Sequence, residues 1–116
     1  MKKIKIGGIE YSTKLGLRFL ENVTKGEEIS LAEVFKKFES ETLLFLPKLL
    51  WYSVNTANQS AGKEPIELDL VYDHLDAVGI QSPEIVTFIQ DFAESIKVHI
   101  PQEETVGKPK KATSKT

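Results

Sequence analysis

His74 is the residue whose neighbours most suggest a chemical site. In the stretch YDHLD it lies between the carboxylates of Asp73 and Asp76, and such a group could hold a metal ion or transfer a proton. On a helix, however, residues at positions i, i+1 and i+3 do not all converge on one ion. The other histidine, His99, lies near the C-terminal end. We therefore expect a solvated polar helix face here rather than a metal or acid–base site.

Common catalytic and nucleotide-binding motifs are absent from the sequence. It contains no G-x-x-x-x-G-K-[ST], G-x-S-x-G or H-E-x-x-H pattern. Gly7-Gly8 lies between two predicted strands with no helix after it, which fits a tight turn and not a phosphate loop. There is no cysteine, so disulfides, thiolate zinc ligands and a cysteine nucleophile are excluded. We expect a protein that is not an enzyme and that needs no metal or cofactor.

Charge is spread unevenly along a chain whose net charge is −2. The last sixteen residues carry four lysines and two glutamates, whereas the first hundred carry eleven basic and fifteen acidic residues. Binding to a duplex depends on neutralising phosphates, so the acidic body argues against a nucleic-acid partner.

One alternative stays open, a small helical DNA-binding regulator or antitoxin-like adaptor. It would need a basic recognition helix. The only basic pair on a predicted helix, Lys36-Lys37, is flanked by Glu33, Glu39 and Glu41. This flanking charge makes the alternative the weaker interpretation.

The sequence predicts no membrane segment and no membrane partner. The start, MKKIKI, has the charge of a secretory signal, but no apolar core follows it. The longest apolar run contains Pro47 and Lys48 and is shorter than the roughly 20 residues that cross a bilayer. We expect a cytoplasmic protein.

Residues 43–55, LLFLPKLLWYSVN, are apolar or aromatic at nine of thirteen positions. A helix that is apolar nearly all round is buried on several sides. One interpretation is a central helix wrapped by the other helices. The other is that one side meets a partner or a second subunit, since Trp and Tyr are favoured at interfaces. The residues assigned to partner binding or self-association are Leu44, Leu46, Leu49, Trp51, Tyr52, Phe92 and Ile96.

The remaining pattern predicts a mainly α fold with a small N-terminal β-hairpin followed by about five helices. Ile4 and Ile6 alternate with lysines, Gly7-Gly8 supplies the turn, and the return strand contains Tyr11. Residues 1–100 form a single helical domain. Residues 101–116 are expected to be a disordered charged tail, because one valine and no aromatic residue bury too little apolar surface.

End signals and apolar stripes locate the helices and the core. Proline inside a helix removes a backbone hydrogen bond, so the central helix should begin or kink near Pro47. The other end signals are Gly26 as a stop, a capping box of Ser30 with Glu33, Asp69 as a cap, Gly79 as a stop, and Ser82 as N-cap before Pro83. The residues predicted to be core from their mid-stripe positions are Leu20, Phe35, Leu50 and Phe88.

The N-terminal block, IKIGGIEYSTKLGLRFLENVTKG, resembles the opening of the tail assembly chaperones of long-tailed bacteriophages of Gram-positive hosts. That opening is a short strand, a turn, a second strand ending in an aromatic residue, and a Leu/Phe-Gly-Leu/Phe segment leading into a Phe-Leu-containing helix. The rest of the chain is similar in style, and the first 25 residues are the strongest part. The residues in the matching places are Ile4, Ile6, Tyr11, Leu15, Gly16, Leu17, Phe19 and Leu20.

The resemblance implies a non-enzymatic assembly factor that acts in the host cytoplasm and is absent from the mature virion. Such proteins bind the tape measure protein, keep this long helical chain soluble, and help bring major tail tube protein subunits to it. A homo-oligomer, as a ring or an open spiral, would suit a long client with many similar sites. Many such genes also make a longer frameshift product, and GKPKK lies in the corresponding region.

Overall fold

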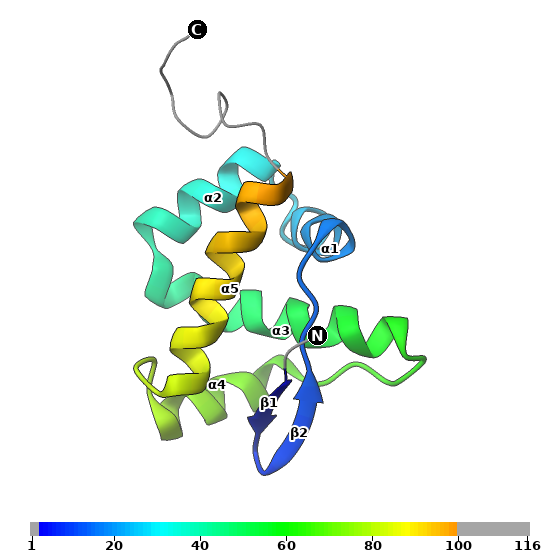
Figure 1. Cartoon of the computed structure of the whole chain (residues 1–116), viewed down its shortest axis with the longest axis vertical. Helices are drawn as coiled ribbons and strands as arrows, with labels where there is room; N and C mark the ends of the chain where they lie inside the picture. Colours follow the sequence, from blue (N-terminus) through cyan, green and yellow to red (C-terminus); the bar gives the residue numbers. More distant parts are fainter. Residues whose placement is uncertain (1–2, 100–116) are drawn as a thin grey trace, which may run out of the picture.

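The computed structural model describes residues 3–99 of the chain and the side chains of residues 3–95. Within that range a two-stranded antiparallel sheet precedes five helices, so the expected fold class is confirmed (Figure 1). The predicted tail, residues 101–116, lies outside the described residues. The elements in chain order are β1 (Lys3–Ile6), β2 (Ile9–Ser12), α1 (Leu17–Glu27), α2 (Leu31–Ser40), α3 (Thr42–Ser60), α4 (Leu68–Val78) and α5 (Pro83–His99).

The hairpin forms at the predicted place and lies against the helices. Gly7 and Gly8 have φ values of 59° and 86°, which a two-residue turn of this kind requires and which glycine adopts without steric cost. β1 packs against α4 and β2 against α3, and Ile4 and Ile6 are buried. An isolated hairpin is only marginally stable in water, so this apolar face is what holds it to the body.

Helix α3 runs through the middle of the molecule and contacts α1, α2, α4 and β2 (Figure 1). The interpretation of a central, wrapped helix is therefore correct. Buried Ser53 of α3 also ties down the hairpin exit, since it accepts from the Lys14 amide at 3.0 Å and donates to the Lys14 carbonyl at 3.1 Å. Pro47 does not begin the helix, because α3 starts at Thr42 and continues through the proline.

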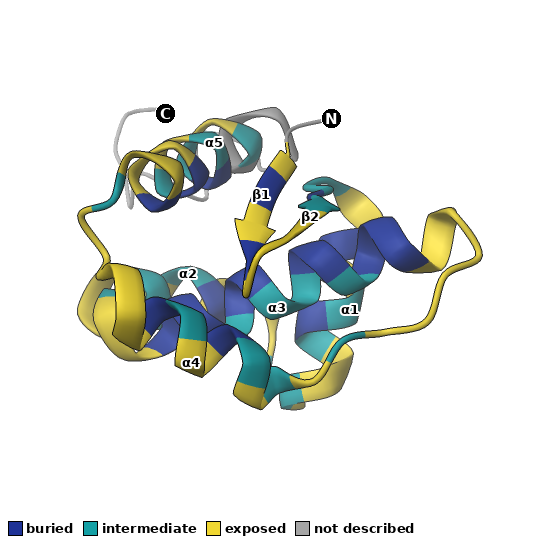
Figure 2. Cartoon of the chain, turned by 90° about the horizontal axis from the view of Figure 1, so that it is seen from below, coloured by how far each residue is buried: buried dark blue, intermediate teal, exposed yellow. Residues whose placement is uncertain are grey.

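Helix α5 covers the core through aromatic side chains. The Phe92 ring meets Phe19 of α1 edge-on at 5.9 Å between ring centroids and Phe38 of α2 at 4.6 Å. Ile85, Phe88 and Phe92 are buried, and Figure 2 shows the buried side of α5 turned toward the rest of the molecule. The predicted apolar face of this helix is thus the face that packs.

Several of the predicted helix ends are confirmed. Ser30 and Glu33 form the capping box, with the Glu33 amide donating to the Ser30 hydroxyl at 3.2 Å and the Ser30 amide donating to the Glu33 carboxylate at 3.0 Å. Gly79 follows the last residue of α4, and Pro83 is the first residue of α5. The Ser82 hydroxyl is buried without a hydrogen-bond partner, so it does not cap α5 through its side chain.

Two of the predicted ends are wrong. Gly26 does not stop α1, which continues to Glu27 and ends at Glu28 in a left-handed conformation with φ 58°. Asp69 does not cap α4, because the N-cap is Glu67 and Asp69 lies in the first helical turn. An acidic residue there is still favourable, since it faces the positive end of the helix dipole.

Of the four residues predicted to be core, Leu20, Leu50 and Phe88 are buried. Phe35 is only partly buried at the edge of the cluster. The reason is that the neighbouring residue Val34 is the fully buried position of α2, so the helix turns Phe35 toward the edge of the core.

Candidate functional site

The structure divides the seven residues that were assigned to partner binding. The prediction of partner contact is wrong for Leu46, Leu49 and Phe92, because the chain itself covers their side chains and they belong to the core. They cannot form a surface on the folded monomer. The side chain of Ile96 lies outside the described residues. Leu44, Trp51 and Tyr52 remain accessible in full or in part.

Leu44 is the most exposed large apolar residue of the described chain, at 74% of its full exposure. Its neighbour Leu43 is 58% exposed, so the first turn of α3 presents two leucines side by side to solvent. Single exposed apolar residues are ordinary, and the adjacency of these two is what makes this turn a candidate contact surface.

Trp51 lies on the flank of α3 where the connection between α3 and α4 returns across it. Its indole N–H donates to the Ile66 carbonyl at 2.7 Å. The Asn55 side chain, one helical turn further along, accepts from the Ile66 amide at 2.8 Å. These contacts fix the loop to the helix and leave the Trp51 ring as an apolar surface with its polar atom already used.

Tyr52 joins α3 to the end of α1. Its hydroxyl donates to the Glu27 carboxylate at 2.7 Å, and the ammonium of Lys48 lies 3.0 Å from the other oxygen of the same carboxylate. A methyl group built at Gly26 would overlap the phenol ring and hydroxyl of Tyr52. Gly26 is therefore required for this close approach and not as a helix stop.

The contacts between Tyr52, Glu27 and Lys48 shift the pKa values of the tyrosine hydroxyl and the glutamate carboxyl. Burial raises the pKa of the Tyr52 hydroxyl above its ordinary value, and the bond to Glu27 raises it further. Burial alone would raise the pKa of the Glu27 carboxyl, but the hydrogen bonds from Tyr52 and Lys48 outweigh it and lower that pKa. At neutral pH the pair is thus a neutral phenol that donates to a charged carboxylate.

The Trp51–Tyr52 groove is a hollow of about 570 Å³ along this side of α3. The two rings have centroids 4.9 Å apart and are tilted by 59°. The residues that line the groove are Asn22, Trp51, Tyr52, Asn55, Gln59, Lys63 and Pro65.

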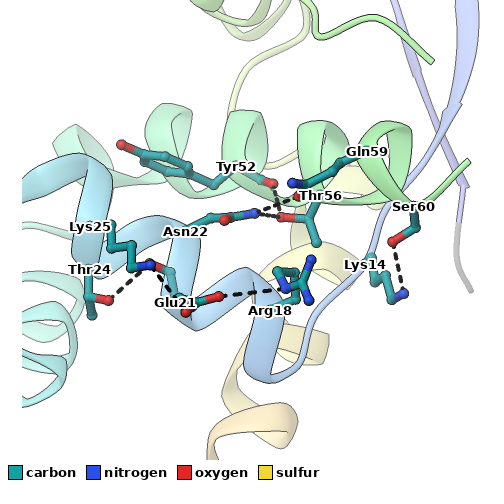
Figure 3. A network of polar contacts seen from close by, with 10 residues as sticks. All are labelled: Lys14, Arg18, Glu21, Asn22, Thr24, Lys25, Tyr52, Thr56, Gln59 and Ser60. Atoms are coloured by element: carbon teal, nitrogen blue, oxygen red, sulfur yellow. Dashed lines mark hydrogen bonds and ion pairs between the residues drawn. The ribbon is translucent and has the colours of Figure 1, made fainter. Parts of the chain in front are cut away.

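The α1 side of the groove is held by the amide of Asn22. This amide donates to the Thr56 hydroxyl at 2.9 Å and more weakly to Gln59 at 3.4 Å (Figure 3). The Thr56 hydroxyl in turn donates to the Tyr52 carbonyl at 2.7 Å. Figure 3 shows Asn22 pointing from α1 toward α3, so the wall is tied together by polar contacts between the two helices.

The groove offers apolar contact and neutral polar groups. The Trp51 N–H and the Tyr52 O–H are already paired within the chain, so the two aromatics present ring surface to a ligand. Asn55 and Gln59 add amides, and Lys63 adds one exposed positive charge. Such a surface is suited to holding an apolar segment of another protein by packing and a few hydrogen bonds.

Sequence reasoning found the two aromatics of the groove but missed its amides. Trp51, Asn55 and Gln59 are spaced by four residues and therefore share one face of α3. Two amides on the same face as a tryptophan, in a helix otherwise rich in leucine, was the signal available. Asn22, Lys63 and Pro65 come from other elements, and only the tertiary structure brings them to this site.

His74 differs in part from the expectation. Asp73 and Asp76 are exposed, as expected for a polar face, but His74 is half-buried and its Nε2 has no hydrogen-bond partner. Among residues 3–99 no group of three His, Cys, Asp or Glu side chains is placed to hold a metal ion. In the same part of the chain, none of the helices has the length and apolar character needed to cross a bilayer.

Comparison with known proteins gives no match: no protein-family model, no curated protein and no solved structure is similar to this chain.

Proposed function

We propose that this protein is a tail assembly chaperone of a long-tailed phage, a binding protein without catalytic activity. Its client would be the tape measure protein, which it would keep soluble while major tail tube protein subunits are recruited. The observation that carries the proposal is the Trp51–Tyr52 groove, which offers apolar ring surface with its polar atoms already satisfied. An unpaired segment of a long helical client would supply the apolar side chains that such a groove accepts.

Two further features support the proposal. The residues that carry the N-terminal resemblance lie in the hairpin, in α1 and in the connection between them. The exposed Leu43-Leu44 pair gives a second apolar contact away from the groove, which suits a homo-oligomer arranged as a ring or a spiral around an extended client. Action in the host cytoplasm and absence from the mature virion are part of the same proposal.

A regulator that binds DNA is the less favoured alternative. Of the basic pair that it would use, Lys37 lies 4.0 Å from the carboxylate of Glu41, the residue that follows α2. Part of the positive charge that phosphates would need is thus already offset.

The test is co-expression with a tape measure protein encoded in the same genome, with the soluble fraction of the client as the readout. We expect the wild-type chain to raise that fraction. Gln59→Arg should abolish the effect, because it places a long charged side chain in the groove while removing only the weak contact to Asn22. The matched control is Gln90→Arg, at an exposed glutamine of α5, which should retain full activity.

An unchanged soluble fraction with the wild-type chain contradicts the proposed function. Loss of activity in the Gln90→Arg control as well would show that added charge, and not the groove, is responsible. Circular dichroism of all three proteins verifies that helical content is equal.

A further inference from the structure

Among the residues that the structure describes, none forms an ion pair with the acidic side chains on the outer face of α4. The helix buries Val71 and Leu75 against the core and turns its opposite side to solvent (Figure 2). Positions 69, 72, 73 and 76 share that side, because they are spaced by three, four and seven residues. We call the four residues there the α4 outer face: Asp69, Tyr72, Asp73 and Asp76, all of them exposed.

This face combines an aromatic ring with uncompensated negative charge. Tyr72 is 38% exposed in the middle of the face, and none of the ion pairs of the described residues involves Asp69, Asp73 or Asp76. The charge is part of a longer pattern, since residues 64–96 contain no lysine and no arginine. The acidic residues in that stretch are Glu64, Glu67, Asp69, Asp73, Asp76, Glu84, Asp91 and Glu94.

The complementary charge is present in the same chain. Residues 97–116 hold five lysines and two glutamates, and four of these lysines fall within residues 108–115. No other stretch of eight residues in the sequence contains as many basic residues. The positions are Lys108, Lys110, Lys111 and Lys115.

The lysine-rich segment can reach the α4 outer face. Only residues 79–82 connect α4 to α5, so the start of α5 lies near the end of α4. Its 17 residues carry the chain about 25 Å away from that end. Lys115 is 16 residues beyond His99, and an extended chain of that length spans roughly 55 Å, which exceeds the length of α5 by about 30 Å.

We propose that residues 108–115 dock, within the same molecule, on the outer face of α4. The lysine ammonium groups lie near the carboxylates of Asp69, Asp73 and Asp76, and the Tyr72 ring offers a surface on which a lysine stem can pack. Each exposed pair is weak and is screened by salt, but the covalent connection keeps the local concentration of lysines high.

While residues 108–115 are docked, they cover the α4 outer face. A separate protein segment that is more cationic would displace residues 108–115, and so would high salt. The proposed contact requires only that the lysines remain near the carboxylates, and it does not require one fixed geometry. The inference is independent of the proposed function, because it concerns contacts within one chain.

The test uses paramagnetic broadening of amide NMR signals in the full chain. The protein has no cysteine, so Ala112→Cys gives one site for a nitroxide label. At about 0.02 M salt we expect the amides of Tyr72, Asp73 and Asp76 to lose most of their intensity, while those of α1 keep theirs. At about 1 M salt, where the screening length is about 3 Å, the α4 signals should return.

Two variants distinguish an effect of the carboxylates on the α4 outer face from an effect of the net charge of the protein. The selective broadening should disappear in the triple variant that combines Asp69→Asn, Asp73→Asn and Asp76→Asn. The control Glu10→Gln with Glu21→Gln and Glu39→Gln changes the net charge equally on exposed acids elsewhere, and it should retain the broadening. Three results overturn the proposal: no α4-selective broadening at low salt, equal broadening in the Asp→Asn variant, or broadening that arises only between a labelled and a separate isotope-labelled molecule.

Discussion

At the scale of single residues, Tyr52 and Gly26 explain how α1 and α3 are held together. The phenol hydroxyl meets the Glu27 carboxylate, and the ring lies where any side chain on Gly26 would be. The same tyrosine forms one wall of the Trp51–Tyr52 groove. The residue that closes the contact between the two helices is thus also the residue that shapes the surface offered to a partner.

Gly26→Ala should destabilise the protein although alanine favours helix. The gain in helix propensity is about 1 kcal/mol, and overpacking against Tyr52 costs about 1–3 kcal/mol, so we expect a net loss of about 1 kcal/mol. Urea unfolding measures it. In a Tyr52→Leu background the same substitution should become stabilising, because the overlapping ring and hydroxyl are gone. A stabilising Gly26→Ala in the wild-type chain would contradict the contact.

Tyr52→Phe should lower the free energy of unfolding by about 1 kcal/mol at pH 7, because the Glu27 carboxylate loses a donor. The difference from wild type should depend on pH. The lowered pKa of Glu27 means that its contribution is present above its ordinary pKa of 4.5 and is lost as pH falls through the folded-state pKa.

The raised pKa of Tyr52 acts at the other end of the pH range. Its contribution is present below the ordinary value of 10.0 and declines above it, where the tyrosine of the unfolded chain ionises first. Urea unfolding of both proteins from pH 3 to pH 11 should therefore show a gap that is widest between these limits. A gap that is constant with pH would show that the hydroxyl acts only through packing.

At the scale of helices and strands, the local signals predicted which elements form and several of their ends, and a tertiary contact explains a glycine that local signals misinterpret. The hairpin turn and the Ser30–Glu33 capping box involve neighbours in sequence, so they could be read without knowing the fold. Glycine commonly ends helices, so the local pattern predicts a helix stop at Gly26. Its actual reason is a ring from α3, 26 residues further along the chain, which no local pattern reveals.

The faces of α3 show the same limit for the candidate site. A helix that is apolar nearly all round does not indicate which leucines meet its own neighbours and which meet another molecule. The sequence predicts partner contact for Leu44, Leu46 and Leu49, but Leu46 and Leu49 are core, whereas Leu44 is exposed. The difference lies in how α1, α2, α4 and β2 are arranged around the helix, and the periodicity of α3 alone does not contain that information.

Ser30→Ala should lower the free energy of unfolding by about 1 kcal/mol, because the Glu33 amide loses its acceptor and the capping box is broken. Ser30→Asp should retain most of the stability, since aspartate is an equally good N-cap. The matched control is Ser40→Ala in the same helix, whose hydroxyl only donates to the Lys36 carbonyl. Urea unfolding should place this control within about 0.5 kcal/mol of wild type.

At the scale of the whole molecule, exposed large apolar residues lie on several elements, and Leu43 and Leu44 are two that follow one another in the first turn of α3. One hydrophobic core runs from the hairpin through α3 to α5. The Trp51–Tyr52 groove lies along the middle of α3, while the Leu43-Leu44 pair lies in the first turn of the same helix. A central helix that carries two separate contact surfaces could hold a client at one and a second copy of the chain at the other.

Self-association is the prediction that belongs to this scale, and the Leu43-Leu44 pair is the surface we assign to it. Burying both side chains between copies would contribute about 3 kcal/mol or more, which corresponds to at least a hundredfold in the dissociation constant. Light scattering across micromolar concentrations should therefore give a mass above that of the monomer, and Leu43→Ser with Leu44→Ser should shift it to the monomer. Exposure at both positions means that this variant should fold normally.

The matched control for this prediction is Ile9→Ser with Leu17→Ser. These residues are exposed to a similar degree, 57% and 68%, but lie in β2 and α1. The control should associate as the wild type does, since a contact repeated by rotation uses one defined surface and not apolar area in general. Equal loss of association in both variants would indicate non-specific hydrophobic contact. A monomer mass for the wild-type chain throughout the range would contradict self-association, and would leave the exposed leucines for the client.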